Sequence, residues 1–327
     1  MTDRRISVRA SLLSLGLIAG VLAALACGPA LPFFNSNITP TPDSGTGLDK
    51  LGEYAATFEA KFVPDNQNLR SWTYHLDIVE NNQGSNRSLV IDGVDQGQDP
   101  GDTTLVRVGD SQYMLGEGVG DATCLIFPAD VDLASSFLLP GSFVKLDALK
   151  DIWKSDGDED VAGKSGTHFT FEAVRLGDKF TDVQGDAVVS GDIVYRYDFS
   201  GHTIDEYFTG QGGTLTWHYE ITSFDVEETL AAPKGCTPPY PIMENATGLT
   251  RFPGLIQYTS SSSEQDVVNF YDTKLIEEGW TVNKDPEIDA NNRVTILNYI
   301  REGEVLNVSI TGTNQGTEVK LFTGENN

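Results

Sequence analysis

The clearest pattern in the chain is an alternation of apolar and polar side chains with a period of two. It begins at Trp72 and returns in long segments that begin at Thr167, Ile193 and Gly213. Successive side chains of a β-strand point to opposite faces of a sheet, so this period predicts strands with one buried face. Shorter strand-like runs lie between turn-rich clusters, at residues 88–92, 104–108, 112–115 and 123–127. The sequence therefore predicts one large antiparallel sheet of hairpins whose aromatic side chains gather on one face.

Helical spacing, with apolar residues three or four positions apart, is present in two segments. They contain Leu48, Leu51, Ala55, Phe58 and Phe62, and, after the start signal Pro140-Gly141-Ser142, Leu146, Leu149 and Trp153. We interpret both segments as amphipathic helices that accompany the sheet, and the first of them would open the domain.

A proline-rich segment at residues 232–245 separates this region from a smaller one. The smaller region has a strand at 255–260, a helix that begins with a capping box at Ser263, and further strand-like runs after the helix. It is predicted to be a β-α-β-β-β module. The predicted domains are therefore residues 48–231 and residues 246–324.

The N-terminal segment has the anatomy of an export signal, in which a basic head is followed by an apolar run over residues 12–26. The end of this run, Ala24-Leu25-Ala26-Cys27-Gly28, resembles a bacterial lipobox, although Ala24 replaces the leucine that is most common there. The resemblance implies that residues 1–26 are removed and that Cys27 is diacylated and becomes the mature N-terminus. Ordinary secretion without Cys27, or a retained anchor helix, are the alternatives.

Each of these alternatives places the rest of the chain outside the cytoplasm. Residues 27–47 are rich in proline, serine and threonine and would tether the first domain to the membrane. We therefore predict a protein that is lipid-anchored at the extracytoplasmic face of the cell membrane.

The chain is strongly acidic, with 48 Asp and Glu against 22 Lys and Arg and a net charge of −26. Removal of residues 1–26 would take away three arginines and Asp3, which leaves 19 basic and 47 acidic side chains and a net charge of −28. Such a protein is repelled by nucleic-acid phosphates and by anionic lipid surfaces. The charge excludes a nucleic-acid partner and favours good solubility.

Two cysteines remain besides Cys27, and an even number is typical of a disulfide in an exported protein. Cys124 lies in an apolar strand-like run, and Cys236 lies in the proline-rich linker. We predict that they form a disulfide that holds the linker to the first domain. Two buried free thiols are the alternative.

The acidic stretch SDGDEDVAGKS, at residues 155–165, contains fragments of two ligand-binding motifs. Five residues rather than four separate its two glycines, and three of the five are acidic, so it is not a phosphate-binding loop. Asp156, Asp158 and Asp160 match the first positions of a calcium loop, but the required Gly and Glu are missing. We interpret the stretch as an acidic solvated turn, with a shallow calcium site at Asp156–Asp160 as the alternative.

The sequence contains no recognisable catalytic or metal-binding motif. Its four histidines, His75, His168, His202 and His218, form no H-x-x-x-H or H-x-H pair, and G-x-S-x-G and C-x-x-C motifs are absent. Zinc sites, serine hydrolases and redox-active cysteines are recognised by these spacings. We therefore expect no metal, no cofactor and no enzymatic activity.

Together with the lipobox and the tether, the series Asp192–Tyr197 and Trp217–Ile221 resemble LolA/LppX/LprG-type lipoproteins, over residues 48–230. This resemblance implies a half-barrel, a strongly curved antiparallel sheet with helices on its concave side, that carries lipids or lipoproteins between membranes. The linker and the segment Phe270–Trp280 are similar to a module of uncharacterised bacterial surface lipoproteins. The expected fold is thus α+β and mostly β, a half-barrel with two or more helices followed by the small module.

The aromatic face of the sheet is the candidate binding surface, as either a filled core or the wall of a groove for an apolar ligand. Its candidate lining residues are Trp72, Tyr74, Phe169, Phe171, Tyr195, Tyr197 and Trp217. We expect a lipid-anchored binding protein that holds or carries a lipid or another apolar molecule. The alternative is a surface interaction or scaffold protein with fully packed domains, whose C-terminal domain binds a protein or a glycan.

Overall fold

The computed structural model of the chain describes residues 46–92, 103–116, 124–131, 133, 149–203, 212–289 and 293–325. Cys27, the predicted export signal, nearly all of the predicted tether and the first part of the second predicted helix, up to residue 148, lie outside the described residues.

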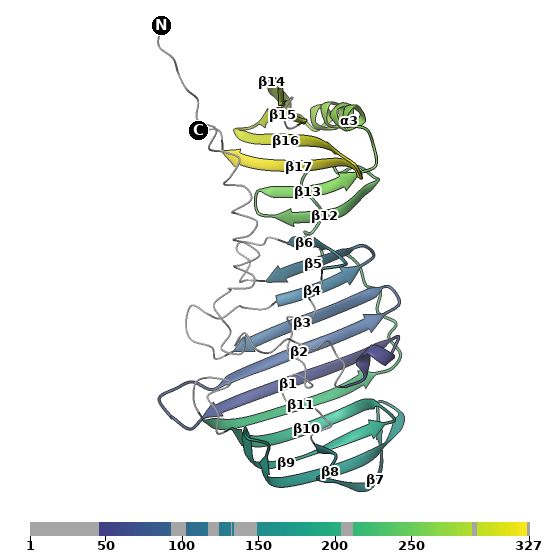
Figure 1. The fold of residues 1–327 in the computed structure, drawn as a ribbon, viewed down its shortest axis with the longest axis vertical. Coiled ribbons are helices and arrows are strands. Elements are labelled where there is room, and N and C mark those ends of the chain that lie inside the picture. The colour runs from purple at the N-terminus through teal and green to yellow at the C-terminus, as the bar shows by residue number, and fades with distance from the viewer. Residues whose placement is uncertain are drawn as a thin grey trace.

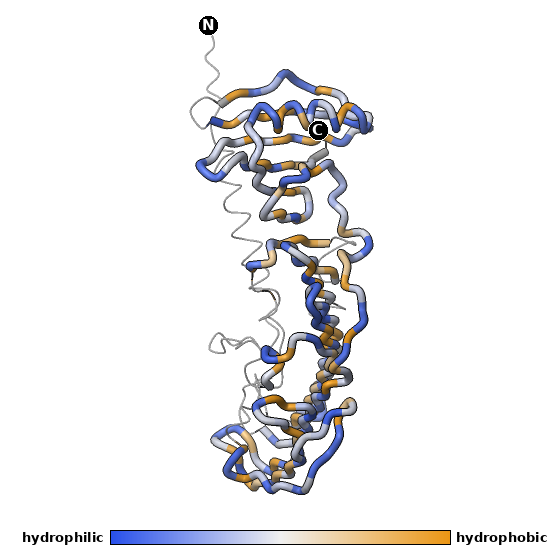
Figure 2. The backbone as a smooth tube through the Cα atoms, turned by 90° about the vertical axis from the view of Figure 1, so that its right-hand side faces the viewer, coloured by the Kyte–Doolittle hydropathy of each residue, from blue (hydrophilic) through white to orange (hydrophobic). Residues whose placement is uncertain are grey.

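The described residues form one long, open and curved antiparallel sheet of 17 strands (Figure 1). Its first part consists of β1 (Tyr54–Pro64), β2 (Trp72–Asn81), β3 (Gly84–Asp92), β4 (Thr103–Val108), β5 (Ser111–Gly116), β6 (Leu125–Pro128), β7 (Trp153–Val161), β8 (Lys164–Leu176), β9 (Phe180–Ser190), β10 (Ile193–Thr203) and β11 (Gly213–Ser223). In space these strands follow the order β7-β8-β9-β10-β11-β1-β2-β3-β4-β5-β6. Seen from the side, the sheet curls at its β7 end (Figure 2).

The second part continues the same sheet. It consists of β12 (Ala246–Phe252), β13 (Leu255–Ser260), β14 (Thr281–Asp289), β15 (Val294–Arg301), β16 (Glu304–Thr313) and β17 (Gly316–Glu325). The order in space is β12-β13-β17-β16-β15-β14, and helix α3 (Glu264–Glu277) packs against β16. The capping interaction predicted at Ser263 is confirmed, because its hydroxyl accepts a hydrogen bond from the Asp266 backbone N–H. Strand β12 was not predicted from the sequence.

The period-two segments form strands as predicted, and their apolar positions share one buried face. Phe58 of β1 lies opposite Leu76 of β2 and Tyr219 of β11, and Tyr219 lies opposite Tyr197 of β10. All four side chains are fully buried. We call this side of the strands β7–β11 and β1–β5 the inner face, and the opposite side the outer face.

The first predicted helix is a correction, because its residues form β1. Among the described residues before that strand, the one helical element is a short 3-10 turn, η1 (Leu48–Lys50). The segment YAATFEAKF also has a period of two, which its small alanines conceal, and both neighbouring strands bury its inward side chains. Pairing on two sides therefore overrides the helical spacing of the larger apolar residues.

The expectation of two or more helices is also wrong for the described residues, in which α3 is the one α-helix. Trp153, placed at the end of the second predicted helix, instead begins β7. Strand β9, between β8 and β10, was missed because its inward positions include Gly185 and Ala187 rather than large apolar side chains.

The acidic stretch at residues 155–165 is not a solvated turn. Most of it forms β7, and the turn itself is limited to Ala162-Gly163, both with positive φ. Within the described part of the chain β7 pairs with β8 alone, so it is an edge strand, and its pairing is interrupted by a register shift between Ser155 and Asp158. Charged side chains and a bulge on an edge strand oppose pairing with another chain.

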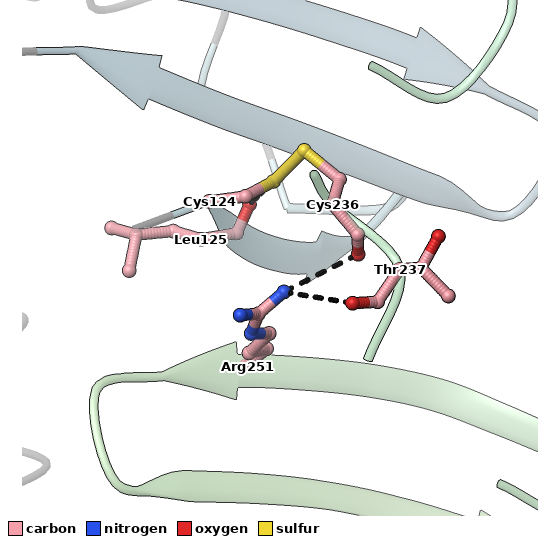
Figure 3. Close-up of a disulfide and its surroundings, with 5 residues drawn as sticks. All are labelled: Cys124, Leu125, Cys236, Thr237 and Arg251. Carbon is pink, nitrogen blue, oxygen red and sulfur yellow. Dashed lines mark hydrogen bonds between the residues drawn. A yellow bond between two sulfur atoms is a disulfide. The ribbon is translucent and has the colours of Figure 1, made fainter. Parts of the chain in front are cut away.

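The two parts of the sheet are joined by a small contact around the disulfide between Cys124 and Cys236 (Figure 3), which agrees with the predicted pairing. One ladder pair, Arg251 with Ile126, connects β12 to β6. The Arg251 guanidinium donates hydrogen bonds to the carbonyls of Cys236 (3.4 Å) and Thr237 (3.2 Å). The disulfide thus holds the linker at the point where the two parts meet.

Candidate functional site

The seven aromatic residues predicted to line a groove come from β2, β8, β10 and β11 and lie in or beside one cluster on the inner face. Six of them are buried, with exposed fractions between 1% and 7%, and Phe169 is half-buried. They are Trp72, Tyr74, Phe171, Tyr195, Tyr197 and Trp217. We call these residues, with Phe58, Phe62 and Phe199, the ring cluster.

Members of the ring cluster contact one another. Phe199 and Trp217 stack with centroids 4.0 Å apart and planes 8° from parallel, and Tyr197 meets Trp217 edge-on at 5.6 Å. Phe171 lies over Gly185, where an added Cβ would come within 2.5 Å of its ring. The missing side chain at Gly185 is therefore replaced by a neighbouring ring, and the rings fill their part of the inner face themselves.

The same face contains an open space at its other end. A pocket of about 410 Å³ lies over the β2–β5 end of the sheet, beside the turn η1. We call it the inner-face pocket. Its polar side chains include Tyr54, Glu80, Ser85, Arg87, Arg107 and Gln112. Leu48, Leu51 and Leu105 contribute apolar surface and also belong to the hydrophobic core that contains the ring cluster.

Strand register explains why these polar groups meet. Glu80 lies opposite Tyr54 and Ser85, Ser85 lies opposite Arg107, and Arg107 lies opposite Gln112. Directly opposite residues on neighbouring strands project from the same face, so five strands place one polar row along the pocket. On β1 and β2, the ring cluster occupies inward positions farther along the same strands, and its other members lie on β8, β10 and β11.

Hydrogen bonds fix most of this row. The Tyr54 hydroxyl donates to one oxygen of Glu80 and Arg107 Nη2 to the other, both at 3.3 Å. The buried amide of Gln112 donates to the backbone carbonyls of Pro128 (3.1 Å) and Val131. Glu80 and Gln112 are thus held as parts of the pocket wall.

Arg87 lies two residues beyond Ser85 on β3, in the row of inward side chains next to this polar row. It is 5% exposed, and its two directly opposite neighbours on the inner face are the apolar residues Ile78 and Leu105. A guanidinium remains charged at any physiological pH and is costly to bury. Its presence in the wall of a pocket is the most distinctive chemical feature of the inner face.

The outer face is charged and contains all four histidines, each beside a carboxylate. His75 contacts Glu59 at 3.0 Å, His218 contacts Asp198 at 2.7 Å, and His202 contacts Asp65 at 3.0 Å. His168 lies 3.4 Å from Asp186. His168 also lies 3.9 Å from Glu159 of β7. These contacts form part of the polar exterior of the sheet.

Arg196 is the centre of the largest ion-pair network on the outer face. It donates to both oxygens of Glu159 and, at 2.8 Å, to Asp186. The hydrogen bonds from Arg196 lower the pKa of Glu159, and the same carboxylate raises the pKa of Arg196. An open groove of about 570 Å³ passes Asp186, Asp198 and His168 and also touches Phe171 and Trp217.

In the residues that the structure describes, no group of three or more histidine, cysteine or acidic side chains has an arrangement that could hold a metal ion. This includes the proposed calcium ligands Asp156–Asp160. No helix among those same residues is long and apolar enough to cross a membrane.

Comparisons with known proteins find similarity to parts of this architecture. A family described as START domain-like matches residues 244–317. No curated protein matches the chain. Similar solved structures include MucB, which is 13% identical over 88% of this chain and 94% of its own, with a TM-score of 0.24. They also include the Pseudomonas aeruginosa MucA/MucB complex, whose matching chain is 10% identical over 86% of this chain and 93% of its own, with a TM-score of 0.24. A LolA superfamily protein from Nitrosomonas europaea is 9% identical over 58% of this chain and 92% of its own, with a TM-score of 0.21.

The pocket residues were not identified from the sequence. The sequence of β3 does contain a signal for the pocket. Its alternation assigns Ser85 and Arg87 to the same buried face as Leu89, although both are polar. A polar residue at an inward position of a strand requires a partner or a cavity.

Proposed function

We propose that this protein is a lipid-anchored extracytoplasmic binding protein that holds a ligand with an apolar portion in the inner-face pocket. The observation that carries the proposal is the combination of about 410 Å³ of open space with buried polar and apolar walls on the inner face. Small-molecule sites in proteins usually have about 300–1,000 Å³ and a few polar groups that orient the ligand.

The ring cluster and the pocket have separate roles in this proposal. The rings form the core that keeps the curved sheet rigid, while Leu48, Leu51 and Leu105 provide apolar contact at the boundary between core and pocket. Acylation of Cys27 would attach the protein to the membrane, and the tether would give the pocket access to ligands there.

The first test is mass spectrometry of organic extracts from the unacylated full chain, Cys27→Ser, purified under native conditions, together with uptake of a fluorescent fatty acid. We expect a co-purified amphiphile or stoichiometric uptake of the probe. Failure of both would contradict the proposal.

A pair of substitutions on one strand localises the site. Ser85→Leu places a larger side chain in the pocket, whereas Ser88→Leu places the same side chain on the outer face of β3. We expect uptake to fall at least about tenfold in the first variant and to be unchanged in the second. Equal uptake by both variants would remove the pocket from the proposal.

The second candidate function is a surface interaction or scaffold protein, and the self-packed ring cluster favours it. In that case the C-terminal part would bind a protein or a glycan and the pocket would take no ligand. Chemical cross-linking on intact cells would then capture the same partner with the unaltered chain and with Ser85→Leu, while no apolar probe would be taken up.

A further inference from the structure

We infer that a second pocket, where the linker meets the β12–β13 hairpin, binds a carboxylate that carries a compact apolar group, and that Arg251 holds this carboxylate. The inference goes beyond the proposed function, because the two pockets share no lining residue in the described part of the chain. We call the second pocket the linker pocket. It has a volume of about 210 Å³, and its wall includes Tyr240, Arg251, Phe252, Leu255, Ile256 and Leu321.

The first observation is the charge of the wall. Arg251 is the one charged side chain among the described residues that line the linker pocket, although the whole chain has 48 acidic side chains against 22 basic ones. Within the described residues, no carboxylate lies within ion-pair distance of its guanidinium. Burial lowers the pKa of Arg251, which is the direction expected for a cation without an anionic neighbour.

The second observation is how Arg251 is held. Its Nη1 donates to the carbonyls of Cys236 and Thr237, and the other terminal nitrogen points away from these carbonyls (Figure 3). The donors on Nη2 and Nε make no hydrogen bond in the part of the chain that the structure describes. The disulfide fixes the linker at Cys236, so the guanidinium is oriented before a ligand arrives. A planar guanidinium is well suited to paired hydrogen bonds with a carboxylate.

The third observation concerns Glu304, an acidic side chain near the pocket. It accepts a hydrogen bond from the Tyr240 hydroxyl, and Nη2 of Arg301 lies 4.0 Å from it. Glu304 is therefore engaged by groups other than Arg251. Repulsion from the remaining acidic side chains is screened beyond about 8 Å at physiological salt, so the local cation determines which charge the pocket attracts.

The size and lining of the linker pocket limit the rest of the ligand. Ile256 and Leu321 are buried, and Phe252 packs edge-on against Phe127 with centroids 5.4 Å apart. The volume lies below the range of about 300–1,000 Å³ that is usual for small-molecule sites. A compact apolar group fits beside the carboxylate, and a long acyl chain does not. A small free acid and the C-terminal residue of a peptide both have this chemistry.

Two ligands with the same phenyl group test the charge requirement: 3-phenylpropionate and the neutral 3-phenylpropionamide. Their affinities for the unacylated full chain are measured by NMR titration of the backbone amide signals. We expect 3-phenylpropionate to bind at least about tenfold more tightly, because a hydrogen bond to a charged group contributes about that much. The signals that move should belong to residues 236–240 and 251–256. Equal affinities would overturn the inference.

A third ligand distinguishes the two sources of the carboxylate. It is the peptide acetyl-Ala-Ala-Phe, used with a free and with an amidated C-terminus. Binding of the free peptide at least as tightly as 3-phenylpropionate would support the inference with a peptide C-terminus as the ligand. Binding of 3-phenylpropionate alone would support it with a small free acid. Equal binding of the free and the amidated peptide would contradict recognition of the carboxylate.

The matched variants are Arg251→Met and Arg175→Met. Arg175 also donates to a backbone carbonyl, that of Gly177 at 3.0 Å, but it lines neither pocket. Both variants lose one guanidinium and change the net charge equally. In Arg251→Met we expect the preference for 3-phenylpropionate over its amide to disappear, whereas Arg175→Met should keep it in full. A full preference in Arg251→Met would overturn the assignment to Arg251.

A further variant separates this inference from the proposed function. Ser85→Leu, which fills the inner-face pocket, should leave the affinity for 3-phenylpropionate unchanged. Loss of that affinity in Ser85→Leu would place the ligand in the inner-face pocket and overturn the inference. If none of these ligands binds, the linker pocket is refuted, while uptake of the fluorescent fatty acid still decides the proposed function.

If Arg251→Met does not fold, the ratio of the two affinities in the unaltered chain still decides the inference. Arg251→Lys then provides a second variant. It keeps the charge but lacks the planar fork, so a reduced preference for 3-phenylpropionate is expected. An unchanged preference would contradict paired hydrogen bonding by the guanidinium.

Discussion

The ring cluster and the inner-face pocket lie on the same face of the same sheet, yet one is filled and the other is open. Strand β2 contributes to both, with Trp72 in the ring cluster and Glu80 in the pocket. In the cluster, rings such as Phe199 and Trp217 fill the space in front of the sheet by stacking on one another. In the pocket, the inward positions carry Ser85, Arg87 and Arg107, which do not form an apolar core.

This difference shows that aromatic positions on a curved sheet are a poor guide to a ligand cavity. Large apolar side chains gain free energy by packing against each other, so they close the space they line unless something holds them apart. Polar side chains that are held by hydrogen bonds to the wall, as Glu80 and Gln112 are, leave the adjacent space accessible.

The largest effect is expected from a substitution in the ring cluster. Trp217→Ala removes a fully packed ring beside Phe199 and Tyr197 and should lower the free energy of unfolding by about 3–5 kcal/mol. Ser85→Ala, in the pocket, should cost less than about 1 kcal/mol. Urea denaturation followed by circular dichroism measures both, and equal losses would contradict the distinction between a packed and an open half.

The disulfide tests the pocket end of the sheet. Cys124 precedes β6, and the carbonyls of Pro128 and Val131 that follow accept the hydrogen bonds of Gln112. The bridge closes a loop across 112 residues, so its removal in the double variant Cys124→Ser/Cys236→Ser should cost about 2–4 kcal/mol.

Hydrogen exchange shows where that loss is located. In the double cysteine variant we expect faster exchange in β6 and in residues 129–131, with β10 and β11 still protected at the centre of the ring cluster. Uniform acceleration across all strands would show that the two halves unfold as one unit.

Gln112 provides a smaller and more local test. Gln112→Leu removes a buried amide that donates to two backbone carbonyls, and we expect a loss of about 1–3 kcal/mol together with weaker ligand binding. The matched control is Gln257→Leu, where the amide donates to the side chain of Glu318 in the second part of the sheet. That variant should lose less than about 1 kcal/mol and retain full binding.

The smallest effect is expected on the outer face of the ring-packed half. Arg196 holds the pKa of Glu159 below its usual value of 4.5, so this pair stabilises the native state fully above that pH. The contribution is lost as the pH falls through the lowered native pKa. More than a third of the Glu159 side-chain surface is exposed to solvent, which screens the ion pair, so the difference between the unaltered chain and Glu159→Gln should be under about 1 kcal/mol at pH 7.

Urea denaturation of both proteins at pH 7 and at pH 3 measures this difference. We expect it to be present at pH 7 and to be smaller at pH 3. A difference that is larger at pH 3 would have the wrong sign for a carboxylate whose pKa is lowered by folding.

The sequence predicted much of the sheet because period-two alternation is a local property. Strands β2, β10, β11 and β13 follow from it. The helix that begins after Ser263 was predicted from its capping box, which is also a local signal. The prediction from alternation was wrong at β1, where small alanines concealed the period of two. It was also wrong at the acidic strand β7, because hairpin pairing with β8 overrides the low strand propensity of aspartate and glycine.

The candidate site was less predictable because it depends on which strands become neighbours. Glu80, Ser85, Arg107 and Gln112 meet through the registers of three successive hairpins, which no single stretch of sequence specifies. The burial of Trp217 and Tyr197 was foreseeable as one of two alternatives, and packing of the rings against each other is what separates those alternatives. The disulfide needed only a count of cysteines in a chain that was predicted to be exported.

A crystal structure of the unacylated full chain with decanoate tests the central claim most directly. The account predicts that the ligand occupies the inner-face pocket and that the rings of Phe199 and Trp217 remain stacked. Decanoate inserted among those rings, or an empty pocket at saturating decanoate, would contradict it.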